Sequence, residues 1–72
     1  MKRSYKLQDL DCANCAAKME CDIQKLAGVN SANISFMTSK LTIDADDGQF
    51  SRVLDEAQSI CSRYEKDCVI VR

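Results

Sequence analysis

The stretch Leu10–Gly28, LDCANCAAKMECDIQKLAG, decides the fold because the spacing of apolar residues changes where it begins. Over residues 4–10, apolar and polar side chains alternate, which is typical of a short strand. Apolar residues then recur every three or four positions, as on one face of a helix. This stripe consists of Ala16, Met19, Ile23 and Leu26. Gly28 follows it, at a place where helices commonly end on a residue with left-handed backbone, so we expect a helix over about 14–26.

The rest of the chain predicts a hairpin, a second helix and a last strand. Apolar residues alternate over 32–36 and over 41–45, and the MTSK stretch between these runs has hairpin-loop length. An apolar stripe marks a helix over 50–61, and CVIV over 68–71 indicates a strand. This order predicts an α+β fold of the ferredoxin-like βαββαβ type, in which a four-stranded antiparallel sheet carries two helices on one face. We expect one domain over residues 1–72.

Composition narrows the function classes. The formal net charge is −1 and no basic stripe is present, so we expect no nucleic-acid binding. No apolar run approaches the ~20 residues that cross a bilayer, and no signal peptide is recognisable. We therefore expect a cytoplasmic domain without direct membrane insertion. Five cysteines, an odd number, favour reduced thiols over a disulfide scaffold, and the lack of histidine excludes Cys/His zinc fingers.

The predicted topology brings three loops together. The first strand, the hairpin turn and the second helix all end at the same pole of a βαββαβ domain. Residues 12–15, 37–39 and 64–67 should therefore be neighbours in space.

Cys12 and Cys15 lie where the first strand gives way to the first helix. The first backbone N–H groups of a helix lack intrahelical acceptors and carry partial positive charge, which favours a thiolate. Two thiolates separated by two residues can hold one soft or borderline metal ion. The same C-x-x-C spacing also occurs in redox pairs, and cysteines can simply pack in a core. These three readings stay open on spacing alone.

The segment DLDCANCAAKMECDIQKLAGV closely resembles the metal-binding motif of the heavy-metal-associated domain family. The DCANC motif and the ending ICSRYEKDCVIVR are similar to the N-terminal domains of zinc/cadmium/lead-transporting P-type ATPases. The resemblance implies the βαββαβ fold and makes Cys12 and Cys15 the metal ligands. Copper-binding members usually carry Met-Thr or similar polar residues before the first cysteine, whereas this chain has Leu10-Asp11.

Asp11 is the residue from which we predict the preference for divalent ions over Cu(I). Carboxylate oxygen is a poor ligand for Cu(I), which prefers two thiolates in a line, but it suits Zn(II), Cd(II) or Pb(II). We therefore expect Asp11 to join Cys12 and Cys15 as a ligand, with these divalent ions favoured over Cu(I). The alternative is that Asp11 is the N-cap of the first helix.

Four other residues are judged by their positions. Glu65 lies in the loop expected beside the metal and is a possible extra ligand, although a solvated loop charge is the alternative. Cys68 opens the last strand near the same pole and is a second possible ligand, although a place in the core or at the sheet edge is the alternative. Cys21 lies roughly 9 Å along the helix from Cys15 and about 120° away, so it cannot share the ion. Cys61 lies on the apolar stripe of the second helix and is expected in the core.

The leading hypothesis is a domain that binds Zn(II), Cd(II) or Pb(II) and transfers it, without being catalytic itself. The resemblance implies that its parent is a heavy-metal-translocating P-type ATPase in the cell membrane. Partners would then be other domains of that transporter or a metallochaperone. A stand-alone metallochaperone for the same ions or for Cu(I) is the first alternative, and a small thiol oxidoreductase is the second.

Overall fold

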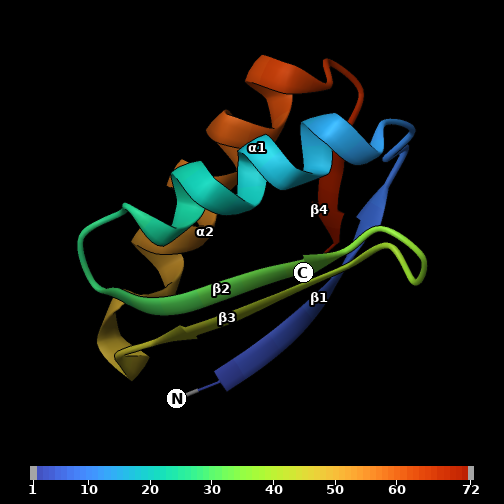
Figure 1. The fold of residues 1–72 in the computed structure, drawn as a ribbon. Coiled ribbons are helices and arrows are strands. Elements are labelled where there is room, and N and C mark those ends of the chain that lie inside the picture. Colours follow the sequence, from blue (N-terminus) through green and yellow to red (C-terminus); the bar gives the residue numbers. More distant parts are fainter. Residues whose placement is uncertain (1, 72) are drawn as a thin grey trace.

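The computed structural model describes residues 2–71 and confirms the βαββαβ order (Figure 1). A 3₁₀ turn over Asp47–Gln49 precedes the second helix. The strands and helices are β1 (Lys2–Gln8), α1 (Ala13–Gln24), β2 (Val29–Ser35), β3 (Lys40–Ala45), α2 (Phe50–Tyr64) and β4 (Val69–Val71).

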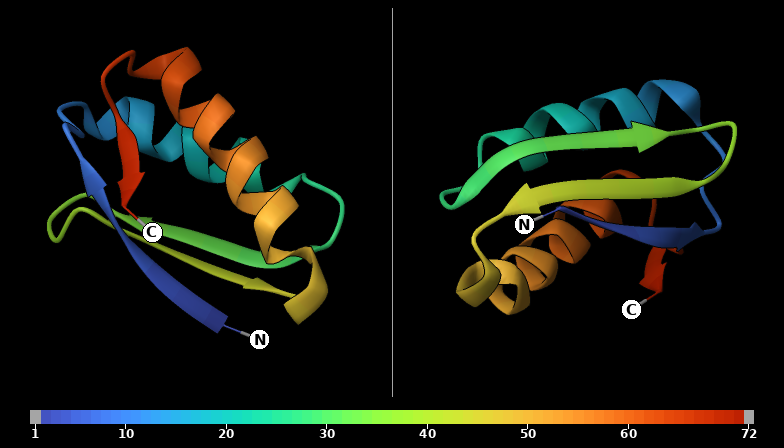
Figure 2. Two further views of the ribbon diagram at one scale, coloured as in Figure 1. Left: turned by 180° about the vertical axis from the view of Figure 1, so that it is seen from behind. Right: turned by 90° about the horizontal axis from the view of Figure 1, so that it is seen from below.

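The four strands form one antiparallel sheet in the order β2-β3-β1-β4. The hairpin register pairs Ile34 with Leu41, and β1 joins the two outer parts by pairing with both β3 and β4. Both helices cover the same face of this sheet, as Figures 1 and 2 show. The predicted ferredoxin-like architecture is therefore confirmed.

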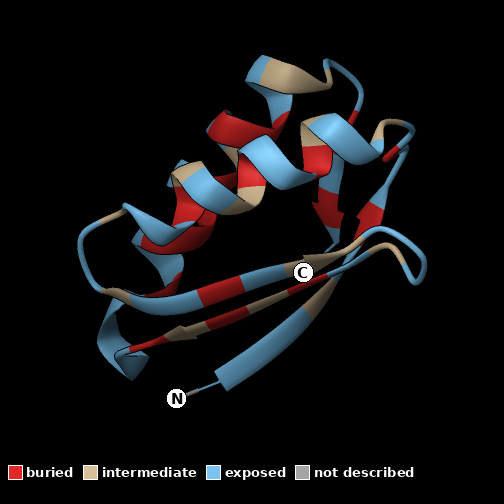
Figure 3. Ribbon diagram, viewed as in Figure 1, coloured by how far each residue is buried: buried red, intermediate tan, exposed pale blue. Residues whose placement is uncertain are grey.

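The core fills the space between the helices and the sheet. Figure 3 shows the buried positions on the surfaces that these two layers turn toward each other. α1 contributes Ala16, Met19 and Ile23, which are three of the four residues in its predicted apolar stripe. The largest fully buried side chains are Leu7, Met19, Ile23, Leu41, Ile43, Val53, Cys61 and Cys68. The apolar periodicity therefore identifies the buried helix face correctly.

The element boundaries differ from the predictions by a few residues. α1 ends at Gln24 rather than near 26, and the chain turns toward β2 at Gly28, whose φ is +89°. The Arg52 guanidinium donates a hydrogen bond to the Ala27 carbonyl at 2.6 Å and so satisfies a backbone acceptor in this turn. Phe36 lies past the end of β2 and is 40% exposed, because the hairpin turn begins before the alternating pattern stops.

Side chains from the two helices cover the backbone of both edge strands. On β2, the Glu20 carboxylate accepts from the Ile34 N–H at 2.7 Å. Gln24 donates to the Ala32 carbonyl on the same strand, also at 2.7 Å. At the other edge, the Gln58 amide donates to the Cys68 carbonyl and accepts from the Ile70 N–H, each at 2.8 Å. These bonds satisfy outward backbone groups that a neighbouring strand would otherwise pair.

Three loops meet at one end of the domain, as predicted. The β1–α1 loop, the β2–β3 hairpin and the α2–β4 loop lie at the same end in Figure 1. The Leu7 N–H donates to the Ser39 carbonyl at 2.7 Å, which joins the end of β1 to the hairpin turn. Within residues 2–71, no helix has the length and apolar character needed to cross a membrane.

Candidate metal centre

A sulfur atom caps the first helix. Cys12 has the extended backbone of an N-cap residue, with φ −126° and ψ 117°, and its Sγ accepts a hydrogen bond from the Cys15 N–H at 3.3 Å. The Cys12 carbonyl accepts from the Ala16 N–H at 3.0 Å and closes the first turn. The alternative that Asp11 caps α1 is therefore wrong, because the chain enters the helix one residue later and Cys12 takes that position.

The two cysteines of this turn differ in ionisation. A hydrogen bond from the Cys15 side chain lowers the pKa of Cys12, and the Cys15 backbone N–H acts in the same direction. The same side-chain hydrogen bond, together with desolvation, raises the pKa of Cys15. Cys12 is thus the thiol of this pair that ionises more readily. This is the asymmetry expected where a helix N-terminus stabilises one thiolate.

A third potential ligand lies just past the C-terminal end of the second helix. Glu65 follows the last residue of α2, and its N–H donates to the Cys61 carbonyl at 2.8 Å. The Cys68 N–H donates in turn to the Glu65 carbonyl at 3.0 Å, so backbone hydrogen bonds fix the residue from both sides. Its carboxylate oxygen and the sulfurs of Cys12 and Cys15 all lie within 4.8 Å of one another. Among residues 2–71 this is the only such cluster of three or more potential metal ligands, and all three residues are half-buried.

These separations suit a single ion. Three atoms held ~2.3 Å from a metal at trigonal angles are about 4.0 Å apart, so the observed cluster needs to contract by less than about 1 Å. Two thiolates and one carboxylate form a mixed soft and hard donor set, which suits borderline divalent ions. Two thiolates alone could also hold Cu(I) in a line, where the sulfurs are about 4.6 Å apart. The carboxylate is therefore the group that distinguishes the two classes of metal.

The charges around the cluster are mostly negative. The hydrogen bonds between the two cysteines dominate their pKa shifts, and the Glu65 carboxylate acts more weakly to raise the pKa of each. Lys18, also on α1, acts to lower the pKa of Cys15. Asp11 is exposed beside Cys12 but does not belong to the cluster of three. Its role as a ligand stays a prediction. An accumulation of carboxylates next to thiols favours a cation of high charge at this position.

The remaining cysteines are not members of the cluster. Cys61 is fully buried, which confirms its predicted place in the core, and burial raises its pKa to about 12. Cys68 is 1% exposed, hydrogen-bonds with Cys61 and has a raised pKa, again mainly because of burial. A buried neutral thiol is a weak metal ligand, and Cys68 is not one of the three clustered residues. Cys21 is exposed on α1.

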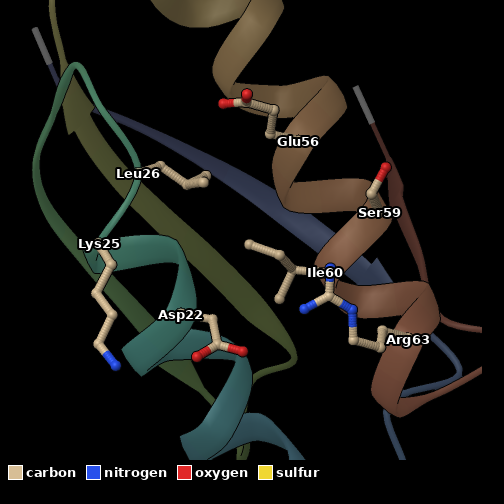
Figure 4. Close-up of a pocket in the computed structure, with 7 residues that line it drawn as sticks. All are labelled: Asp22, Lys25, Leu26, Glu56, Ser59, Ile60 and Arg63. Atoms are coloured by element: carbon tan, nitrogen blue, oxygen red, sulfur yellow. The ribbon is translucent and has the colours of Figure 1, made fainter.

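A groove of about 430 Å³ separates the two helices on their outer side (Figure 4). None of the three clustered residues lines it, since its walls are Asp22, Lys25, Leu26, Glu56, Ser59, Ile60 and Arg63. Asp22 also accepts a hydrogen bond from the Tyr64 hydroxyl at 2.5 Å, and this bond raises the pKa of Tyr64. Sequence analysis does not indicate this bond, because its partners are 42 residues apart.

Part of the chain is similar in sequence to metal-transporting ATPases. A zinc/cadmium/lead-transporting P-type ATPase of Escherichia coli is 49% identical over 43 residues, which are 60% of this chain and 6% of that protein. A cadmium, zinc and cobalt-transporting ATPase of Bacillus subtilis is 41% identical over 46 residues, or 64% of this chain and 7% of that protein. The chain thus matches only a small part of the length of these relatives.

Solved structures give the same fold. The N-terminal domain of ZntA in its Zn(II) form is 33% identical, with a TM-score of 0.68 over 96% of this chain and 86% of that one. The CopZ metallochaperone has a TM-score of 0.74 over 99% of this chain and all of its own, but at 16% identity this likeness shows the fold alone. The family model of the heavy-metal-associated domain matches residues 4–58. The chain therefore belongs to the heavy-metal-associated domain family.

Proposed function

We propose that this domain captures Zn(II), Cd(II) or Pb(II) through the thiolates of Cys12 and Cys15 and the carboxylate of Glu65. The observation that carries the proposal is the clustering of these three ligand atoms within 4.8 Å, on half-buried residues at the start of α1 and just past the end of α2. The relatives named above transport zinc, cadmium, lead or cobalt, which supports the same class of ion for this chain.

Charge separates divalent ions from Cu(I) at this cluster. Two thiolates and one carboxylate carry three negative charges, so a divalent ion leaves a net charge of −1 and Cu(I) leaves −2. Like charges at such short distances repel strongly where water is partly excluded. Cu(I) also gains little from an oxygen ligand, whereas Zn(II), Cd(II) and Pb(II) accept one.

Asp11 supplies a fourth ligand in this proposal when the ion is Zn(II), which is usually four-coordinate. It stands directly before Cys12 in an exposed loop, so its carboxylate can turn toward an ion without disturbing the core. Replacing Asp11 with Ala should weaken Zn(II) binding and spare Cu(I). Equal losses for both metals would contradict this role.

The same cluster suits transfer as well as capture. Its ligands are half-buried at a loop end, so an incoming thiolate can add to the ion before one of the first ligands leaves. We infer that the domain passes its ion to another domain of a heavy-metal-translocating P-type ATPase, as a cytoplasmic part of that membrane transporter. A stand-alone metallochaperone is the second candidate, because all three clustered ligands come from this chain and holding an ion needs no other part of a transporter. Reading the gene on either side of the codons for residues 1–72 discriminates between the two.

The test is an anaerobic titration of the reduced domain with Zn(II), Cd(II), Pb(II) and Cu(I), in which each metal is offered to the domain and to a competing chromophoric chelator. We expect stoichiometric binding that Cys12→Ser or Cys15→Ser abolishes for every metal. Cys21→Ser is the matched control, because this exposed cysteine lies on the same helix outside the cluster. Binding that survives both ligand substitutions, or that falls equally with Cys21→Ser, would overturn the proposal.

A further inference from the structure

The hydrogen bond between Tyr64 and Asp22 connects the two helices, and Tyr64 directly precedes a residue of the metal cluster. Tyr64 is the last residue of α2, and its hydroxyl donates to an Asp22 carboxylate oxygen on α1 at 2.5 Å. Both residues are half-buried. Glu65, the proposed third ligand, comes immediately after Tyr64.

We propose that the Tyr64–Asp22 hydrogen bond holds Glu65 at metal-binding distance from Cys12 and Cys15, so that it sets the preference for divalent ions over Cu(I). Tyr64 and Asp22 are then positioning residues that touch no metal themselves. This inference rests on the proposed function, in which Glu65 is a ligand.

The connection works because one rigid helix carries both the sulfurs and the anchor. Cys15 and Asp22 belong to the continuous helix α1, and seven residues of helix span about 10 Å. Tyr64 and Glu65 are adjacent, with Cα atoms ~3.8 Å apart. Fixing the Tyr64 hydroxyl on Asp22 therefore fixes the end of α2, and with it Glu65, relative to the sulfurs.

Other hydrogen bonds restrain Glu65 only within its own half of the domain. Its N–H bonds to Cys61 in α2, and its carbonyl accepts from Cys68 just before β4. These bonds orient the loop against α2 and β4, but they do not set its distance from α1. Asp22 lines the groove between the helices, where the two helix surfaces leave space between them (Figure 4). The bond to Tyr64 supplies a directional link where apolar packing alone would permit sliding.

The consequence differs between metals. Cu(I) needs only the two thiolates, which both come from the α1 end of the cluster, so its binding does not depend on where α2 ends. Zn(II), Cd(II) and Pb(II) use Glu65 and lose affinity when that carboxylate is free to move away. A purely structural role for the bond would instead lower stability and weaken every metal alike.

The test compares Tyr64→Phe with wild type, using Cd(II) and Cu(I) as probes in chelator competition. We expect Cd(II) affinity to fall about tenfold, the scale of losing a residue that orients a metal ligand, while Cu(I) affinity stays within about twofold. Asp22→Ala should reproduce the loss, and Asp22→Asn should largely restore Cd(II) binding because its amide oxygen still accepts from Tyr64. Tyr5→Phe is the matched control, since it removes the chain's other phenol oxygen, on β1.

A double variant separates this inference from the proposed function. In a Glu65→Gln background, Tyr64→Phe should cause no further loss of Cd(II) affinity, because the group it positions is gone. If Glu65→Gln weakens Cd(II) binding but Tyr64→Phe and Asp22→Ala do not, the positioning role is wrong and the proposed ligand stands. If Glu65→Gln has no effect, the third ligand itself is wrong. Equal losses of Cd(II) and Cu(I) affinity in Tyr64→Phe would also overturn the positioning role.

Discussion

Replacing Glu65 with Gln should lower the affinity for divalent ions without lowering the affinity for Cu(I). The substitution keeps the size of the side chain but removes its negative charge and one of its two oxygens. Because the ligand atoms already lie within 4.8 Å of one another, little binding free energy is lost in rearranging the loop to bring the carboxylate to the ion. Residues that merely orient a metal ligand are worth 10–100-fold in affinity, so we expect a direct ligand to reach the upper end, about 100-fold. That ratio corresponds to about 2.8 kcal/mol of binding free energy.

The Cu(I) affinity should not fall when Glu65 is replaced by Gln. The Glu65 carboxylate raises the pKa of both Cys12 and Cys15, so its removal makes both thiolates easier to form. It also removes one negative charge from a cluster that Cu(I) only partly neutralises. We therefore expect Cu(I) affinity to stay constant or increase.

The assay is the same chelator competition, run for Cd(II) and Cu(I) on one reduced sample at fixed pH. Absorption from cadmium–thiolate charge transfer reports whether both sulfurs remain bound. Asp67→Asn is the matched control, because it removes an exposed carboxylate from the same loop. The reasoning is refuted if Cd(II) and Cu(I) affinities fall together, or if Asp67→Asn weakens Cd(II) binding as much as Glu65→Gln.

Three further outcomes follow from the same structure. Metal affinity should rise with pH, because the ion displaces protons from the thiols. Binding should release about one proton at a pH between the lowered pKa of Cys12 and the raised pKa of Cys15, and about two protons at a pH below both pKa values. Calorimetry in buffers of different ionisation enthalpy measures the number of protons released. Gly28→Ala should cost about 1–2 kcal/mol in urea unfolding, because φ is +89° and the added Cβ would lie 2.8 Å from the Arg52 guanidinium; an unchanged midpoint would contradict this. Gln58→Ala should cost about 1–3 kcal/mol in the same assay, since two backbone groups at the β4 edge lose their partner, and hydrogen exchange at Ile70 should accelerate.

The fold could be predicted from the sequence because its signals are local. The stripe containing Met19 and Ile23 marks the buried face of α1, and the alternation around Leu41 and Ile43 marks the inner face of β3. Each pattern reflects the regular repeat of side-chain directions along a helix or a strand. Predicted boundaries are less accurate, since the hairpin turn leaves Phe36 partly exposed although it continues the alternating pattern.

The cluster could be predicted only in part. The C-x-x-C spacing and the helix start identify Cys12 and Cys15, because both sulfurs belong to one turn of chain. Asp11 stands out in sequence because it is adjacent to Cys12, yet the group that lies with the sulfurs is Glu65, 50 residues beyond Cys15. Its position depends on where α2 ends and on how the helices are joined. No local sequence pattern indicates the exact end of α2 or the contacts between the helices. The predicted topology therefore placed the loop near the sulfurs but did not identify Glu65 as the carboxylate that joins them.

The covered sheet edges limit how two of these domains can meet. A strand from another chain would have to displace Gln58 at one border, or Glu20 and Gln24 at the other, before it could extend the sheet. Each displacement breaks hydrogen bonds that already satisfy the main chain, so growth by strand addition has little to gain. Two copies, or this domain and a partner that exchanges metal with it, are therefore expected to meet through side-chain surfaces, such as the end of the domain where the three loops lie. Contacts of this kind can be brief and reversible.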